Sequence, residues 1–197
     1  MADGSRRTAI LAAAKLEFGT QGYAGARIER IAVAARVNKQ LLFHYFDSKD
    51  GLYIAAVSAL LSDFRQPPPG SASTPGEALK CMAAELVGRV AASPGLLRTL
   101  AECARGSAVP DGASRQASTW LAETAKSFRA IVVDGQRTGF FRDDVDSQDI
   151  ASTVVAAAVG ISLIDSGVAD GSVDEARGVS SLATVIGQVV ADYCAWR

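Results

Sequence analysis

The stretch VNKQLLFHYFDSKDGLY, residues 37–53, places three polar side chains at positions 38–40 just ahead of four consecutive rings at positions 43–46. Residues 39–46, which contain no glycine or proline, predict one short helix. Successive residues of an α-helix lie about 100° apart around its axis, so four neighbours cannot share one buried face. We therefore expect one or two of these rings to face outward.

A second short helix, with Ile28, Ile31 and Ala32 turned inward, precedes this one, and only the turn ARVN at positions 35–38 separates the two. Two short helices joined by such a turn, the second beginning with polar residues, are typical of a helix-turn-helix. The second helix of that motif lies in the major groove of DNA. Asn38 is the expected N-cap of this helix.

The first turn of the second helix carries the chemistry of base recognition. Lys39 offers a cation to the acceptors of guanine, and Gln40 offers an amide that can bond adenine at two points. Leu42 and Phe46, four residues apart, are expected to face the core, which turns the rings between them toward DNA. The predicted DNA-contact residues are Arg27, Asn38, Lys39, Gln40, Leu41, Phe43, His44, Tyr45 and Lys49.

Two of these residues are expected at phosphates. Ser48 is predicted to cap the following helix, whose N-terminus would form a phosphate site together with Lys49, and Arg27 would serve the other flank. Each of these DNA contacts has an alternative interpretation. Lys39 and Gln40 could form an ordinary solvated helix start, and His44 could be a partly buried or pH-sensitive histidine. Arg6 and Arg7 belong either to a solvated tail or to a basic arm that follows a groove.

Charge is distributed unevenly although the net charge of the 197 residues is only −1. Residues 1–50 hold eight Lys and Arg against five Asp and Glu, a balance of +3, and the other 147 residues have a balance of −4. A basic segment beside a larger acidic one is expected when the small part meets a polyanion.

The whole chain is predicted to be helical, because good helix formers dominate and apolar residues recur three and four apart. We expect about nine helices: three short ones, one connector, and a larger bundle. The predicted domains are a helix-turn-helix DNA-binding domain at 1–50 and a larger helical domain at 51–197. The first short helix is expected at residues 6–19, and the connector helix follows Ser48 and ends near Phe64. The helices of the bundle are expected at residues 77–92, 94–105, 114–137, 147–166 and 174–197, and a proline-rich linker covers 65–76.

Residues 9–57, AILAAAKLEFGTQGYAGARIERIAVAARVNKQLLFHYFDSKDGLYIAAV, resemble the DNA-binding domain of the TetR family of bacterial transcriptional repressors. The resemblance combines a glycine-aromatic pair after the first helix, the Ile-Ala of the second, the Val-x-Lys turn and the aromatic-Phe-x-Ser-Lys entry to the fourth. Residues 135–151, GQRTGFFRDDVDSQDIA, also resemble the loop that precedes helix eight in that family.

The resemblance implies an all-α homodimer with an N-terminal three-helix DNA-binding domain and a C-terminal helical bundle, so that residues 51–197 form a ligand-binding and dimerisation domain. It also implies that helices eight and nine pair two subunits and that a small-molecule effector bound in the C-terminal domain lowers the affinity for a double-stranded DNA operator. The residues expected at the dimer interface are Val154, Ala158, Ile161, Val185, Val189 and Trp196.

The chain departs from the family pattern at two positions. Ala26 stands where the family has a Thr or Ser cap for helix two, so this end is expected to be looser by about 1 kcal/mol. Arg36 stands where a turn glycine with positive φ is common, at a strain of about 1–2 kcal/mol if the geometry is kept.

A ligand cavity is predicted among large side chains of the bundle, although such stripes are more often simply core. The candidate pocket residues are Phe64, Met82, Leu86, Cys103, Trp120 and Phe128.

Several function classes find no support. The three cysteines lack metal-site or disulfide spacing, and the acidic run at 143–149 lacks the Gly and Glu of a calcium loop. With one histidine and no catalytic motif, we expect neither an enzyme nor a cofactor. No signal or membrane-spanning segment is evident, so a cytoplasmic location is expected. The rival interpretations are a helical protein-interaction scaffold with a vestigial helix-turn-helix and a small-molecule enzyme with decorative N-terminal helices.

Overall fold

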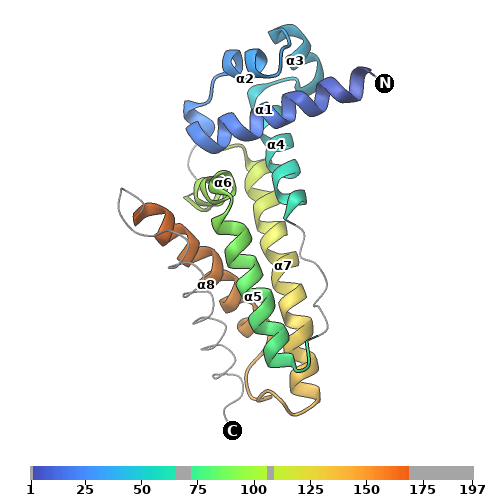
Figure 1. Ribbon diagram of the computed structural model, residues 1–197, viewed down its shortest axis with the longest axis vertical. Coiled ribbons are helices and arrows are strands. Elements are labelled where there is room, and N and C mark those ends of the chain that lie inside the picture. The colour runs from blue at the N-terminus through green and yellow to red at the C-terminus, as the bar shows by residue number, and fades with distance from the viewer. Residues whose placement is uncertain (1, 65–71, 106–108, 169–197) are drawn as a thin grey trace. The chain divides into compact units, whose positions relative to one another are not determined.

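The structure is a computed structural model that describes residues 2–64, 72–105 and 109–168 (Figure 1). Over these residues the backbone forms eight α-helices and no strand, which confirms the all-α prediction. The helices are α1 (Ala2–Gly25), α2 (Ile28–Ala34), α3 (Lys39–Phe46), α4 (Lys49–Asp63), α5 (Pro75–Ala91), α6 (Pro94–Arg105), α7 (Asp111–Arg137) and α8 (Ser147–Val168). The predicted helix at 174–197 lies outside the described residues.

The described helices belong to two compact units. Unit 1 holds α1 to α4, α6 and the start of α7 up to Thr119, and unit 2 holds α5, the rest of α7 from Trp120, and α8. The helix-turn-helix, formed by α2 and α3, is therefore part of unit 1. The predicted functional boundary between residues 50 and 51 stays a prediction.

Helix α1 is longer than the sequence suggested. The prediction ended it at Gly19, but the helix continues to Gly25 and kinks at Gly22, whose φ of 70° and ψ of 174° are not helical. The glycine-rich segment therefore bends the helix without ending it. A single glycine absorbs the left-handed conformation, and helical hydrogen bonding resumes when the Ala26 N–H donates to the Gly22 carbonyl at 3.1 Å.

The core of unit 1 is built where α1 packs against α2, α4 and α6. Ile10, Ala14 and Phe18 of α1 are at most 3% exposed. Helix α4 buries Leu52, Tyr53, Ala56 and Val57, whereas Ala55, Ala59 and Leu60 are only half-buried. The reason is that α4 contacts α1, α3 and α6, so its buried face is turned toward three neighbours.

Helix starts follow the expected capping chemistry. The side chain of Asn38 accepts a hydrogen bond from the Leu41 N–H at 2.7 Å, and the Ser48 hydroxyl accepts one from the Gly51 N–H at 3.0 Å, so both predicted N-caps are confirmed. Helix α5 begins two residues before the prediction, because Thr74 caps it and Pro75 occupies its first turn.

Unit 2 buries apolar residues from all three of its helices, among them Leu79, Val132 and Val154. The loop after α7 is held down by Phe141, which is 2% exposed, and by the Gln136 amide, which donates to two loop carbonyls at 3.0 and 2.9 Å. The acidic run in this loop caps α8, because Asp146 accepts the Gln148 N–H. Among the described residues no acidic, histidine or cysteine cluster could hold a metal ion.

Candidate nucleic-acid interface

Helix α3 rests on two buried side chains and exposes its polar head. Leu42 is fully buried and Phe46 is 5% exposed, as predicted. Asn38, Lys39 and Gln40 are exposed at the head of the helix. Further along, His44 is exposed, whereas Leu41, Phe43 and Tyr45 are half-buried. The outward set therefore contains donors and rings, and the inward set contains aliphatic and aromatic anchors.

The turn before α3 contains a residue in the left-handed conformation, at the position where the family resemblance implied one. Arg36 has a φ of 56°, which confirms the expected conformation at a non-glycine residue. The turn is closed by the Val37 N–H, which donates to the Ala32 carbonyl at 3.0 Å. Because L-residues other than glycine adopt this conformation at a cost of about 1–2 kcal/mol, the surrounding hydrogen bonds must hold it in place.

The ammonium group of Lys39 has a partner on the neighbouring helix. Its Nζ lies 2.6 Å from Oε1 of Glu29 on α2, and both side chains are more than half exposed. The hydrogen bond from Lys39 is the main cause that lowers the pKa of Glu29 below its ordinary value. This ion pair places a carboxylate beside the predicted base-reading lysine, a feature that sequence reasoning missed.

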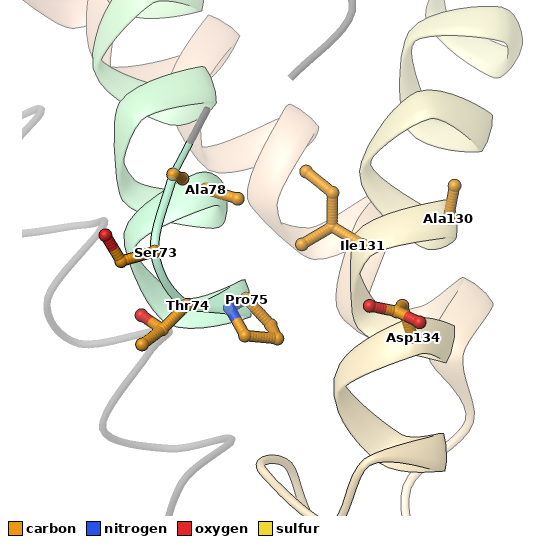
Figure 2. Close-up of a pocket in the computed structure, with 8 residues that line it drawn as sticks. Ser73, Thr74, Pro75, Ala78, Ala130, Ile131 and Asp134 are labelled. Atoms are coloured by element: carbon orange, nitrogen blue, oxygen red, sulfur yellow. The ribbon is translucent and has the colours of Figure 1, made fainter. Parts of the chain in front are cut away.

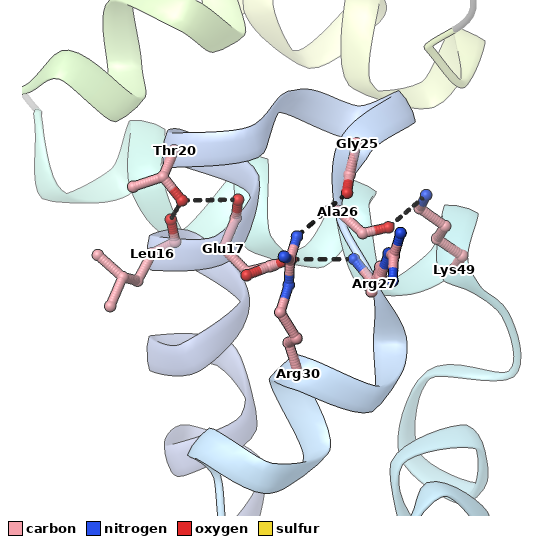
Figure 3. Close-up of polar contacts among 8 residues, drawn as sticks. All are labelled: Leu16, Glu17, Thr20, Gly25, Ala26, Arg27, Arg30 and Lys49. Carbon is pink, nitrogen blue, oxygen red and sulfur yellow. Dashed lines mark hydrogen bonds and ion pairs between the residues drawn. The ribbon is translucent and has the colours of Figure 1, made fainter.

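The start of α2 is capped from α1 (Figure 3). Its N-cap residue, Arg27, makes no side-chain cap. Instead, Oε1 of Glu17 accepts the Arg27 N–H at 3.0 Å and the Arg30 Nε–H at 2.7 Å, and Arg30 also donates to the Gly25 carbonyl at 3.3 Å. The prediction that Ala26 leaves this end looser overlooked Glu17, which stands ten residues before Arg27 and becomes its neighbour only in the fold.

Lys49 joins α4 to the start of α2 (Figure 3). Its ammonium group donates to the Ala26 carbonyl at 2.8 Å and lies 4.9 Å from the centre of the Tyr23 ring. The phosphate contact of Lys49 stays a prediction. Within the protein, Lys49 links the first turn of α4 to the backbone just before α2. Arg27, the other predicted phosphate residue, is exposed.

The first turns of α1 approach the end of α3. Arg6 and Arg7 are exposed and lie in helix α1, and a contact of this segment with a DNA groove stays a prediction. The guanidinium carbon of Arg7 lies 5.3 Å from the centre of the Phe46 ring, a cation–π contact.

The predicted ligand residues are mostly core. Met82, Leu86, Trp120 and Phe128 are at most 9% exposed within unit 2, whereas Phe64 and Cys103 are half-buried in unit 1. A surface hollow of about 370 Å³ occurs elsewhere in unit 2 (Figure 2). It is lined by Ala72, Ser73, Thr74, Pro75, Ala78, Ala130, Ile131 and Asp134, and none of these was predicted.

The predicted dimer residues are only partly described. Val154 and Ala158 are buried in unit 2 at 1% and 0% exposure. The side chain of Ile161 and residues Val185, Val189 and Trp196 lie outside the described part of the chain. In that part, none of the helices is long and apolar enough to cross a membrane.

Comparison with known proteins agrees with this geometry. Residues 10–56 match the model of "Bacterial regulatory proteins, tetR family". The HTH-type transcriptional repressor SCO4008 of Streptomyces coelicolor is 34% identical over 152 residues, which cover 76% of this chain and 74% of the repressor. The HTH-type transcriptional repressor NicS of Pseudomonas putida is 28% identical over 147 residues, 73% of this chain and 69% of NicS.

Solved structures show the same fold. The transcriptional regulator FadR from Bacillus subtilis, crystallised in complex with stearoyl-CoA, superposes with a TM-score of 0.77 over 95% of this chain and 98% of its own. The two sequences are only 14% identical, so this likeness concerns the fold.

Proposed function

The chain belongs to the TetR family of bacterial regulatory proteins, and we propose that it acts as a homodimeric repressor which leaves its DNA operator when a small molecule binds. It is a DNA-binding transcriptional regulator, as its relatives are named. The proposal concerns the finer points: repression, the homodimer, the effector, the residues that touch DNA, and action in the cytoplasm.

One observation carries the proposed DNA contact. Lys39 and Gln40 are exposed at the head of α3 while Leu42, two residues on, is fully buried. A helix anchored by its apolar side and presenting a cation and an amide at its N-terminal turn suits insertion into a major groove. In this arrangement Asn38 and Leu41 lie at the groove edge, and Phe43, His44 and Tyr45 meet sugars, phosphates or thymine methyl groups.

A dimer would place two copies of α3 in successive major grooves, about 34–36 Å apart. An effector acts by favouring a spacing that no longer fits one turn of DNA, which is a coupling between two sites. It must therefore bind the two spacings with different affinity. The buried dimer and pocket residues named above are the starting candidates for mutagenesis.

The decisive experiment for the regulator proposal is genome-wide capture of bound DNA, followed by titration of the captured fragment and of a scrambled duplex. A regulator should prefer its operator by at least about 10³-fold at physiological salt. A helical scaffold with a vestigial helix-turn-helix would bind both duplexes weakly and lose them as salt rises. That second result would overturn the proposed function.

Substitutions then assign the contacts. Lys39→Ala and Gln40→Ala should each weaken operator binding by about 1–3 kcal/mol, with the loss concentrated at one base position. Lys126→Ala is the matched control, because Lys126 is an exposed cation on α7 outside the proposed interface. If Lys126→Ala weakened binding as much as Lys39→Ala while Gln40→Ala had no effect, charge alone, and not base reading, would drive binding.

The effector is sought by thermal shift. A compound that binds the folded protein raises its free energy of unfolding by mass action, by about 2.7 kcal/mol when the compound is present at a hundred times its Kd. The melting temperature rises with it. A genuine effector must also lower the operator affinity of the same preparation. A compound that stabilises the protein without this second effect binds somewhere that does not control DNA release.

A further inference from the structure

We propose that Glu102 of α6 is a positioning residue for DNA binding: its carboxylate fixes both the kinked end of α1 and helix α4, and thereby sets operator affinity without touching DNA. This inference deepens the proposed function and rests on it. All of the contacts that support it lie within unit 1.

Glu102 receives two hydrogen bonds from two different helices. Its Oε2 accepts the backbone N–H of Tyr23 on α1 at 3.2 Å and the hydroxyl of Tyr53 on α4 at 3.2 Å. Tyr53 is 1% exposed, and Thr99, one turn earlier on α6, also hydrogen-bonds to its hydroxyl. Burial raises the pKa of Tyr53 far above its ordinary value, so its hydroxyl remains a donor at every physiological pH.

The kink in α1 is shaped to admit this carboxylate. A Cβ at Gly22 would lie 2.2 Å from Oε1 of Glu102, and the φ of +70° at Gly22 also disfavours any side chain. The backbone conformation therefore favours glycine at this position, and any side chain there would displace the Glu102 carboxylate.

A second contact fixes α6 to α1 about two turns away. A Cβ at Gly19 would lie 2.9 Å from the Cα of Gly95, so the two backbones nearly touch there. With Gly95 and Glu102 seven residues apart on α6, the helix is held to α1 at two points. Two points fix the direction of a helix as well as its distance.

The contact at Tyr23 continues to the helix-turn-helix. The centroids of the Tyr23 and Tyr53 rings lie 4.9 Å apart, and the ammonium group of Lys49 lies over the Tyr23 ring. The Tyr23 hydroxyl donates a hydrogen bond to the Asp50 carboxylate. Lys49 in turn holds the Ala26 carbonyl at the start of α2. A shift of Glu102 therefore moves the start of α2 and the start of α4 together, and α3 lies between these two helices.

The test compares Glu102→Ala and Glu102→Gln in the full-length protein, using fluorescence anisotropy with the captured operator duplex. Glutamine keeps an acceptor oxygen and alanine does not, so we expect about tenfold weaker binding for alanine and a threefold or smaller loss for glutamine. Tyr53→Phe removes one donor only and should weaken binding by an intermediate amount. Amide exchange at Tyr23 should accelerate in Glu102→Ala.

Val132→Ala is the control for a purely structural effect. Val132 is fully buried in unit 2, so its truncation lowers the melting temperature without touching the contacts of Glu102. It should leave operator affinity unchanged. If it weakens operator binding as much as Glu102→Ala does at an equal loss of melting temperature, the positioning role is wrong.

The remaining outcomes are also decisive. Wild-type affinity in both Glu102→Ala and Tyr53→Phe would overturn the inference and leave the proposed function intact. Absence of any preferred fragment for the wild-type protein would instead remove the proposed function, and the inference with it. Should Glu102→Ala fail to fold, the comparison of Tyr53→Phe with Val132→Ala decides the question.

Discussion

Replacing Glu17 with alanine should loosen the start of α2 and lower the stability of the protein. The carboxylate is only 14% exposed at its side chain, and a single oxygen accepts the Arg27 N–H at 3.0 Å and the Arg30 Nε–H at 2.7 Å. Loss of a charged acceptor costs about 1.5–3 kcal/mol. Because the Arg30 side chain is 48% exposed, solvent screening reduces the expected loss to about 1–2 kcal/mol.

The assay is urea denaturation together with thermal melting. For a chain of this length the expected loss corresponds to a melting temperature lower by about 2–8 °C. Glu17→Gln keeps an acceptor for the Arg27 N–H but loses the ion pair, so its stability should fall between those of the wild type and the alanine variant. Glu123→Ala is the matched control, since Glu123 is exposed on α7.

Amide exchange locates the effect. In Glu17→Ala the Arg27 amide and the first turn of α2 should exchange faster than in the wild type, while α5 and α8 should be unchanged. If the alanine variant is no less stable than Glu123→Ala, or if exchange at Arg27 is unaltered, then Glu17 does not cap α2 and the reasoning from its contacts is refuted.

Three further substitutions or titrations follow from the same contacts. Glu29→Gln removes the carboxylate that pairs with Lys39 of α3, which leaves this ammonium group available to the operator bases, so binding should tighten by up to about 1 kcal/mol, the usual size of an exposed ion pair; unchanged operator affinity in anisotropy titrations would contradict this. Burial, assisted by the neighbouring carboxylate, raises the pKa of Tyr23 from 10.0 to about 12. The folded state therefore holds this proton more tightly, and the stability it contributes is complete below pH 10 and lost between pH 10 and 12. Urea midpoints should fall less steeply over that range in Tyr23→Phe, and parallel curves would refute the shift. In a Cys194→Ser background, the exposed Cys81 should react with a thiol reagent faster than Cys103, whose pKa is raised mainly by burial; equal rates would show that Cys103 is accessible.

Local signals in the sequence predicted the helix caps and the buried anchors of the helix-turn-helix region. The caps Asn38 and Ser48 and the buried anchors Leu42 and Phe46 were found because capping and helical periodicity act between residues three or four apart. Arg36 was identified as a left-handed residue only through the family resemblance.

Contacts between distant residues were beyond that reasoning. Glu17 accepts a hydrogen bond from a residue 10 positions away in sequence, and Glu102 accepts hydrogen bonds from residues 49 and 79 positions away. No local sequence pattern marks a carboxylate as an acceptor for a distant helix. The length of α1 was misjudged because a lone glycine can end a helix or merely kink it. The buried Met82 and Trp120 illustrate why a stripe of large side chains does not distinguish a pocket from a core.

The central claim is that the head of α3 enters the major groove, and site-specific photo-cross-linking tests it most directly. A benzophenone amino acid at position 40 should cross-link to bases within each operator half-site, whereas the same group at exposed position 122 on α7 should give no DNA adduct. Cross-linking from position 122 but not from position 40 would contradict the account.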